Sequence, residues 1–413
     1  MRPQDLGEPD RTGRAPPHFL YLVHDLADPA VRRRLMMFQA GGADVAIAGF
    51  RRSQEPAALI EDVAPIELGQ TENGNFMQRA VAVARSTLSI RSKFGHLAKP
   101  EVIIARNLEM LVVAVRLKSF FGSPEIKIAY ECLDIHRLML RKDRTGSALR
   151  GLEKRLLRHV SIIITSSPAF VRNYFRPLAD ITQPIEIVEN KHLELVNSSA
   201  TDGDDAGARA HSPWKIGWFG ALRCKRSLEV LSEFTQEQRG RFQIVLRGIP
   251  SLDVFPDFHG FVKAQPYMSF EGRYKNPEDL SAIYEDVHFS WVIDLFEAGQ
   301  NSAWLLPNRL YEGCRFAAVP IAVKNTETAE FLSSRLIGIA MEDLSVSELM
   351  RVLSTLTSEQ YYAHRNAVTA LPKKLWVYDL KDCEALVSKI AGSVVTSQSS
   401  AREIPASVSL ERT

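Results

Sequence analysis

Apolar runs of strand length alternate along the chain with longer segments of helical periodicity. In the first half we expect strands at 18–25, 44–50, 101–106, 126–134, 161–166 and 185–190. In the second half we expect strands at 215–220, 242–247, 268–272, 289–296, 319–323 and 337–341. Helical patterns lie between them, for example at 29–39 and 75–93. Strands separated by helices are typical of parallel sheets, so the pattern predicts an α/β protein with two Rossmann-like, doubly wound domains facing a cleft.

The two series of strands suggest limits for each part of the chain. We expect a disordered lead at 1–17, an N-terminal domain at 18–195, a linker at 196–213, a C-terminal domain at 214–371, a terminal helix at 372–392 and a disordered tail at 393–413. The lead has charge but no apolar core, so we do not expect it to be a signal peptide. The linker is rich in Gly, Ser, Asp and Ala without periodicity, as domain boundaries often are.

Composition narrows the class of protein. A chain of 413 residues with 45% hydrophobic and 24% charged residues is long enough for two soluble domains. The net charge of +2 does not suggest a nucleic-acid partner. The four cysteines include no CxxC pair, which argues against a disulfide framework or a zinc site and favours a cytoplasmic location. No G-x-G-x-x-G follows the first strand, so no dinucleotide cofactor is expected.

The segment 289–325 has the pattern strand, loop, short helix, strand. Pro307 suits the first turn of that helix, where its missing N–H is not needed. Apolar residues fall on one face of the helix, and Asn308 and Glu312 share the opposite face. A helix start at the edge of a parallel sheet favours an anionic ligand such as a diphosphate, and Glu312 can accept hydrogen bonds from ribose hydroxyls. The alternative is that Glu312 is a solvated helix residue.

The sequence LPNRLYE at 306–312, followed by Ala318 and by Pro320, Ile321 and Ala322, resembles the donor site of GT-B glycosyltransferases of the family-4 kind. Those enzymes usually carry two glutamates separated by seven residues, but here Trp304 stands where the first is expected. The glycine-rich turn after the first strand is also replaced, by HDLADP. The chain is therefore most similar to exopolysaccharide transferases of the succinoglycan type, which keep only the second half of the motif.

This resemblance implies roles for residues on the donor side. The expected donor-binding residues are Glu312, Asn308, Arg309, Arg223, Lys225, Gly220, Gly272 and Tyr274. The resemblance implies that Glu312 holds the ribose, while the cations after Gly220 and the helix start bind the diphosphate. Tyr274 is a candidate to stack on the base. A basic solvated turn and an ordinary packed aromatic are the structural alternatives.

Candidate catalytic residues follow two strands of the first domain. The segment YECLDIHR places Glu131, Asp134 and His136 close together, in a loop expected to face the cleft. A general base there can act on an acceptor hydroxyl. His24 and Asp25, at the end of the first strand, are rivals for this role. A lone histidine is more often structural than catalytic.

The segment 137–158 is strongly basic and has leucines on one helical face. Such a surface can dock on anionic lipid headgroups at the inner membrane. An ordinary amphipathic helix with a solvated basic face explains the same pattern.

Taken with the resemblance, these features imply a metal-independent transferase. It would move a hexosyl group, in the first instance glucosyl, from a UDP-sugar to a lipid-linked oligosaccharide in bacterial exopolysaccharide biosynthesis. No Asp-x-Asp motif is present, and no cofactor is expected beyond the nucleotide-sugar substrate. Peripheral association with the cytoplasmic membrane face would follow. The alternatives are a nucleotide-sugar epimerase or hydrolase of the same fold, or a non-catalytic partner subunit.

Overall fold

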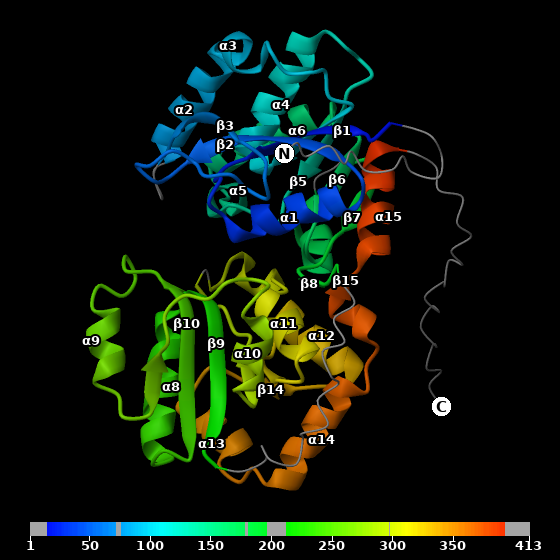
Figure 1. Cartoon of the computed structure of the whole chain (residues 1–413). Helices are drawn as coiled ribbons and strands as arrows, with labels where there is room; N and C mark the ends of the chain where they lie inside the picture. Colours follow the sequence, from blue (N-terminus) through cyan, green and yellow to red (C-terminus); the bar gives the residue numbers. More distant parts are fainter. Residues whose placement is uncertain (1–14, 72–75, 178–180, 196–211, 297, 393–413) are drawn as a thin grey trace, which may run out of the picture.

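The computed structural model describes residues 15–71, 76–177, 181–195, 212–296 and 298–392. Two parallel sheets, each covered by helices, lie one above the other in Figure 1. The arrangement confirms the predicted fold class of two Rossmann-like domains. Most of the expected linker, the lead and the tail lie outside the described residues.

The N-terminal domain is built on a seven-stranded sheet of order β3-β2-β1-β4-β5-β6-β7. Its strands are β1 (His18–Val23), β2 (Asp44–Arg51), β3 (Ile66–Gln70), β4 (Val102–Arg106), β5 (Lys127–Glu131), β6 (Ile162–Thr165) and β7 (Ile185–Ile187). Its helices are α1 (Pro29–Ala40), α2 (Phe76–Leu88), α3 (Ile90–Phe94), α4 (Asn107–Phe121), α5 (Arg137–Leu140), α6 (Arg144–Leu157), α7 (Pro168–Phe170) and the π-helix η1 (Val171–Phe175).

The C-terminal domain contains a six-stranded sheet of order β11-β10-β9-β12-β13-β14. Its strands are β9 (Trp214–Leu222), β10 (Phe242–Pro250), β11 (Met268–Phe270), β12 (Phe289–Trp291), β13 (Val319–Val323) and β14 (Ile339–Met341). Its helices are α8 (Lys225–Glu237), α9 (Phe258–Lys263), α10 (Leu280–Glu285), α11 (Asn308–Arg315), α12 (Glu327–Arg335), α13 (Val346–Leu353) and α14 (Ser358–Thr369), with the 3₁₀ turns η3 (Asn301–Trp304) and η4 (Lys373–Leu375).

The end of the chain returns to the first domain. Strand β15 (Val377–Tyr378) pairs with β8 (His192–Leu193), and α15 (Leu380–Ala391) then packs against α1, as Figure 1 shows. Buried Cys383, Leu386 and Val387 of α15 join the apolar cluster that contains Phe38 of α1. This crossing connects the two domains and packs beside Gly41, on the side where α1 ends, so α1 is held by elements from both ends of the chain.

Local sequence explains how α1 is placed at the edge of the first sheet. Asp28 precedes the helix, and its side chain accepts a hydrogen bond from the Ala30 N–H at 2.9 Å. Pro29 occupies the first turn, where no N–H is needed. Val31, Leu35 and Phe38 are buried against the sheet. The opposite side of α1 is thereby turned toward the second domain.

Four expectations about elements were wrong in detail. The terminal helix expected at 372–392 begins only at Leu380, because η4 and the strand β15, which pairs with β8, come before it. Strand β3 was not anticipated, because its sequence IELGQ has no long apolar run. The helix expected at 75–93 divides into α2 and α3 around Ser89. The strand expected at 289–296 ends at Trp291, and a loop follows. Among the helices described, none is both long and apolar enough to cross a membrane.

Candidate active site

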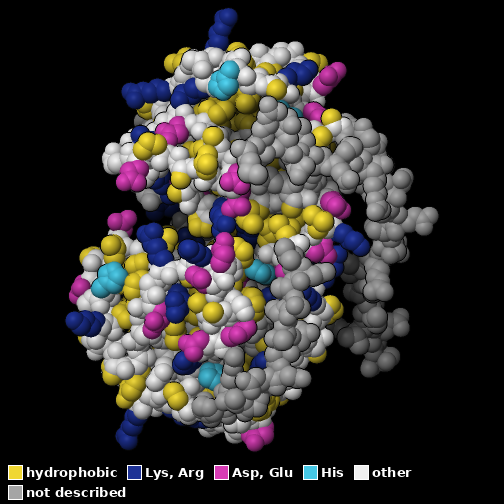
Figure 2. All heavy atoms as spheres, viewed as in Figure 1, with side chains coloured by type: hydrophobic (Ala, Val, Ile, Leu, Met, Phe, Trp, Pro, Cys, Tyr) yellow, Lys and Arg dark blue, Asp and Glu magenta, His cyan; other side chains and the backbone are white. Residues whose placement is uncertain are grey.

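A cavity of about 740 Å³ lies between the two domains. The first turns of α1 line it from the N-terminal domain, and the ends of β9 and β10, the loop 273–278 and Asn308 line it from the C-terminal domain. Figure 2 shows Lys and Arg side chains gathered around the hollow between the two halves of the molecule. We call this the interdomain cavity.

Bare backbone forms part of its wall. Gly220 and Gly248 have φ angles of 104° and 125°, in the left-handed region that favours glycine. A Cβ atom on Gly248 would lie 2.0 Å from the Gly220 carbonyl oxygen. Gly272, with φ 78°, accepts a hydrogen bond from the Gly248 N–H at 2.8 Å through its carbonyl. A ligand can therefore approach the main chain closely at this sheet edge.

Glu312 lies on α11 and is only 2% exposed. One carboxylate oxygen accepts a hydrogen bond from Asn276 Nδ2 at 2.7 Å, and the other accepts one from the Tyr284 hydroxyl at 3.2 Å. Burial raises the pKa of Glu312, whereas the positive charge of Arg33 on the opposite domain lowers it. The alternative of a solvated glutamate is therefore wrong. The expected polar face of this helix is covered, because α10 and the loop 273–278 pack over it.

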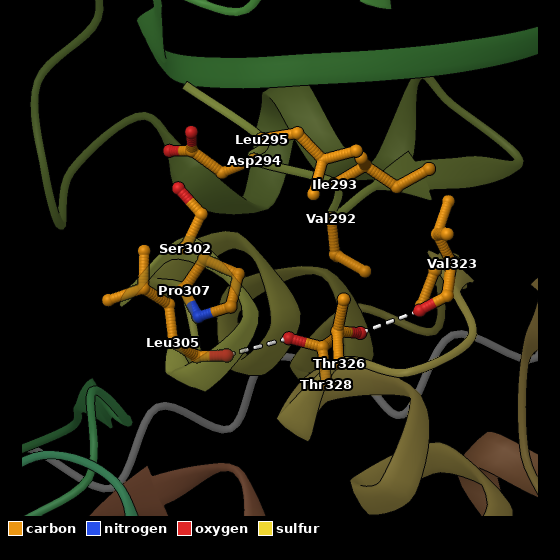
Figure 3. A pocket seen from close by; sticks show the side chains of 11 residues that line it. Val292, Ile293, Asp294, Leu295, Ser302, Leu305, Pro307, Val323, Thr326 and Thr328 are labelled. Carbon is orange, nitrogen blue, oxygen red and sulfur yellow. Dashed lines mark hydrogen bonds between the residues drawn. The ribbon is translucent and has the colours of Figure 1, made fainter. Parts of the chain in front are cut away.

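Asn308 and Tyr274 both line the interdomain cavity, as does Asn276, which bonds Glu312. The loop that precedes α11 is fixed by the following helix. The Thr328 hydroxyl donates to the Leu305 carbonyl at 2.9 Å, as Figure 3 shows. The structure thus brings together the donor-side candidates Glu312, Asn308, Tyr274 and Gly220.

Arg309 and Arg223 gather instead around Asp294. Arg223 donates to Asp294 through Nε at 3.1 Å and Nη2 at 3.0 Å, and its guanidinium lies 5.2 Å from the Phe296 ring centroid. Buried Arg309 donates to the Ile293 carbonyl at 2.7 Å. Asp294 and Ile293 line one small pocket with Pro307, at the start of α11 (Figure 3). Neither arginine lines the interdomain cavity.

Lys225 lies at the start of α8 with 64% of its side chain exposed. Its ammonium is 3.7 Å from the Glu229 carboxylate, one turn further along the helix. It borders a separate groove between α8 and α9. The structure therefore does not bring Lys225 to Glu312.

A second cavity, of about 520 Å³, lies within the N-terminal domain. His24, Asp134 and His136 all line it, so side chains from both rival catalytic pairs share one space. Asp25 is turned into its own loop, where it accepts from the Ala27 N–H at 3.0 Å and pairs with Arg52 at 3.1 Å. We call this the N-domain cavity.

Asp134 connects the N-domain cavity to the second domain. Its carboxylate accepts a hydrogen bond from Asn301 Nδ2 at 2.6 Å, and that amide also donates to the Ile135 carbonyl at 2.7 Å. Desolvation raises the pKa of Asp134, although Arg223 lowers it. The His136 ring nitrogen Nδ1 accepts from the Leu138 N–H at 3.3 Å, which caps α5. Asp134 is thus the candidate acid or base at the domain junction.

His24 differs from His136 in its surroundings. Burial, and then the positive charge of Arg106, lower the pKa of His24 to about 4. Its Nδ1 atom is buried and has no hydrogen-bond partner among the residues that the structure describes. At neutral pH the ring is uncharged, so it can accept a proton or a hydrogen bond.

Glu131 was expected in a loop facing the cleft, and this was wrong. It is fully buried at the end of β5 and accepts hydrogen bonds from Arg34 at 2.6 Å and from Tyr21 at 2.6 Å. Arg106 lies 3.5 Å away and also pairs with Asp28 at 3.1 Å. The network holds α1 against the sheet, so Glu131 is a structural residue.

Sequence reasoning missed three residues of the interdomain cavity. Gly248 was not identified because a single glycine in a strand is only a weak sign of a ligand site. Asn276 escaped because its partner Glu312 lies 36 positions further along the chain. Arg33 escaped because it stands within a run of three arginines. Its guanidinium donates to the carbonyl and side-chain oxygens of Asn190 at 3.3 and 2.9 Å.

Comparisons with known proteins identify the family and the fold of this chain. No family model matches the sequence. The succinoglycan biosynthesis protein ExoL of Rhizobium meliloti (strain 1021) is 55% identical over 374 residues, which are 90% of this chain and 93% of that protein. The chain belongs to the ExoL family. The resemblance to a GT-B glycosyltransferase of the exopolysaccharide kind is thereby confirmed.

Solved structures share the fold of this ExoL-family chain. HepE from Anabaena, in complex with UDP and glucose, has a TM-score of 0.66 and 13% identity, with 91% of this chain and all (100%) of that chain covered. Sucrose-phosphate synthase from Thermosynechococcus elongatus has a TM-score of 0.64 and 13% identity, with 91% and 98% covered. In the described part of the chain, no three His, Cys, Asp or Glu side chains are grouped as metal ligands.

Proposed function

We propose that this glycosyltransferase moves a hexosyl group, in the first instance glucosyl, from a UDP-sugar to a lipid-linked glycan. The observation that carries the proposal is the buried Glu312 carboxylate on α11, behind a cavity that separates two Rossmann-like domains. Membership in the ExoL family supports a step in exopolysaccharide assembly. HepE, which shares the fold, is described in complex with UDP-glucose and supports this class of donor.

On the donor side, the ribose lies against Asn276 and Glu312 in this proposal. A ribose hydroxyl takes over the hydrogen bond that Asn276 now donates to the carboxylate. The diphosphate lies at the start of α11, where unpaired N–H groups and the helix dipole favour negative charge. Gly220 and Gly248 allow its close approach, and Tyr274 packs near the base. Arg223 adds positive charge next to Asp294, whereas Lys225 stays outside the proposed site.

On the acceptor side, Asp134 is the proposed general base and His24 its alternative. The acceptor hydroxyl oxygen forms a bond to the anomeric carbon, and its proton goes to the base. The bond between that carbon and the diphosphate oxygen breaks, and UDP leaves with the electron pair. His136 and Asp25 act by shaping the loops around the N-domain cavity.

The membrane-bound part of the acceptor is proposed to lie near the basic segment 137–158. In α6, Leu152 is 41% exposed and also borders the N-domain cavity. Arg150 is tied to the Met139 and Arg141 carbonyls, but Arg155 and Arg158 are exposed. Apolar and cationic groups thus lie side by side, as on surfaces that bind anionic lipid. The cytoplasmic face of the membrane is the proposed location.

The test is UDP release from UDP-glucose by purified protein, with and without a lipid extract that contains glycan acceptors. The proposal expects release that depends on the extract. Release without any acceptor would indicate a hydrolase instead, and binding without release would indicate a non-catalytic subunit. Glu312→Ala should weaken UDP binding by about 1.5–3 kcal/mol, as for hydrogen bonds to a charged group. Unchanged affinity in a folded variant would contradict the ribose assignment.

A further inference from the structure

Arg33 is a half-buried residue of α1 that lines the interdomain cavity opposite Gly220 and Asn308. Two of its guanidinium nitrogens donate to Asn190, whose own side-chain amide donates to the Leu306 carbonyl at 2.9 Å. Leu306 lies two positions before the first residue of α11. The guanidinium is therefore held in place, and the residue that holds it also contacts the loop leading into the proposed donor site.

Arg33 forms no close ion pair of the kind that its neighbours form, although the carboxylates of Glu312 and Asp28 act on its charge from farther away. Arg32 pairs with Glu61 and Glu278, Arg34 pairs with Glu131, and Arg106 pairs with Asp28. Around Arg33 itself, the described residues place no carboxylate oxygen within 4.0 Å. Burying a cation without an ionic partner is unfavourable. A cation fixed in a cavity wall without its own carboxylate indicates an anion that arrives from solution.

We propose that Arg33 is the N-terminal domain's ligand for the diphosphate of the nucleotide sugar, which it binds across the interdomain cavity from the start of α11. This inference rests on the proposed function. A planar guanidinium binds two phosphate oxygens at once, which a lysine cannot do. The donor-side residues Gly220 and Asn308 share its cavity, whereas Asp134 and His24 border the other one. The geometry therefore favours the donor over an acidic acceptor.

The role follows from the reaction. When the bond to the sugar breaks, negative charge grows on the terminal phosphate of UDP. A guanidinium already fixed by Asn190 stabilises that charge without reorganising. Because Arg33 belongs to the acceptor-side domain, a diphosphate bound between Arg33 and α11 also draws the two domains together. Donor binding and closure of the cavity would then be coupled.

The experiment compares calorimetric titrations of uridine, UMP and UDP into the full chain and into Arg33→Ala, Arg33→Lys and Arg116→Ala. Arg116 is an exposed arginine of α4 outside the cavity and serves as the matched control. We expect Arg33→Ala to bind UDP about 10- to 100-fold more weakly and uridine within about twofold of the wild type. Arg33→Lys should fall between, and Arg116→Ala should match the wild type.

Two results would overturn the inference. The first is that Arg33→Ala, shown to be folded by its thermal transition, binds UDP with the affinity of the wild type. The second is that its affinities for uridine and for UDP fall by the same factor. The second result would mean that Arg33 only supports the structure. If Arg33→Ala does not fold, the Arg33→Lys titrations decide on the same criteria. If the wild-type chain binds no UDP, the proposed function itself fails. If Glu312→Gln binds both uridine and UDP more weakly, the proposed function is supported independently of Arg33.

Discussion

Arg32, the residue before Arg33, joins the two domains directly, and its removal should open the interdomain cavity. From α1 it donates to the Asn276 carbonyl at 2.6 Å and to Glu278 at 3.2 Å, both in the C-terminal domain. It also pairs with Glu61 of its own domain at 2.5 Å. Asn276 in turn donates to Glu312. The variant Arg32→Ala removes the two contacts of Arg32 with the C-terminal domain and leaves the fold of each domain in place.

The magnitude follows from the exposure of the group. The Arg32 side chain is 37% exposed and that of Glu278 is 50% exposed, so their ion pair contributes only about 0.2–1 kcal/mol. The hydrogen bond to the Asn276 carbonyl is partly buried and has a charged donor, so it contributes about 1–2 kcal/mol. Together they favour the closed arrangement by about 1–3 kcal/mol, a factor of roughly 5 to 150. If only the closed form binds donor, the Kd for UDP should rise by up to that factor of roughly 5 to 150.

The assay combines UDP titration with small-angle scattering. Arg32→Ala should bind both uridine and UDP more weakly and show a larger radius of gyration without ligand. This differs from Arg33→Ala, which should lose UDP selectively. A double-mutant cycle with Glu278→Ala should give a coupling of about 0.5–1 kcal/mol. Arg351→Ala is the control, because it removes an arginine–glutamate pair confined to α13.

The reasoning would be refuted by unchanged UDP affinity together with an unchanged radius of gyration in folded Arg32→Ala. A zero coupling energy with Glu278→Ala would be a narrower failure. It would show that Arg32 favours the closed arrangement through its hydrogen bond to the Asn276 carbonyl and not through the ion pair with Glu278.

Three further changes test stability. Gly248→Ala places a Cβ atom 2.0 Å from the Gly220 carbonyl oxygen, at a φ of 125°. It should lower the free energy of unfolding, measured in urea, by about 1–3 kcal/mol or more. An unchanged free energy of unfolding would contradict the described contact. Arg34→Met leaves Glu131 buried without its closest cation and should cost about 3–5 kcal/mol, and a melting temperature equal to that of the wild type would refute it. Burial raises the pKa of Glu153, so the folded chain binds this proton more tightly than the unfolded chain. Its contribution to stability should fall as pH rises from the unfolded value of 4.5 through the raised folded value, and Glu153→Gln should lack this fall; parallel melting curves over pH 4–8 would argue against it.

Local patterns in the sequence predicted the elements well, because strands and helices depend mainly on nearby residues. Pro307 and the motif that follows it correctly indicated the start of α11. The burial of Glu312 could not be read in the same way, since the groups that cover it, Asn276 and Tyr284, lie 36 and 28 positions away. Hydrophobic periodicity placed Glu312 on a polar face, and only the packing of α10 shows that the face is covered.

The prediction that the cations after Gly220 bind the diphosphate depended on which residues lie next to them in space, and only the tertiary structure shows this. Arg223 ends beside Asp294, which lies 71 positions further along the chain, and Lys225 finds Glu229 one turn away on its own helix. A sequence shows that positive charges follow a strand, but it does not show which carboxylate will neutralise them. For this reason the composition of a basic turn is weak evidence for a phosphate site.

The run of arginines at 32–34 shows what the sequence alone cannot predict about each side chain and how single substitutions can test it. Successive residues of a helix point about 100° apart, so three adjacent cations of equal sequence character reach three different environments. Arg34 turns inward to Glu131, and Arg32 turns outward to Asn276 and Glu278 of the other domain. Only the middle residue borders the cavity without a carboxylate of its own among the described residues. The three side chains therefore divide the tasks of holding α1, joining the domains and, in our proposal, binding the diphosphate, and single substitutions along one helix can separate these tasks.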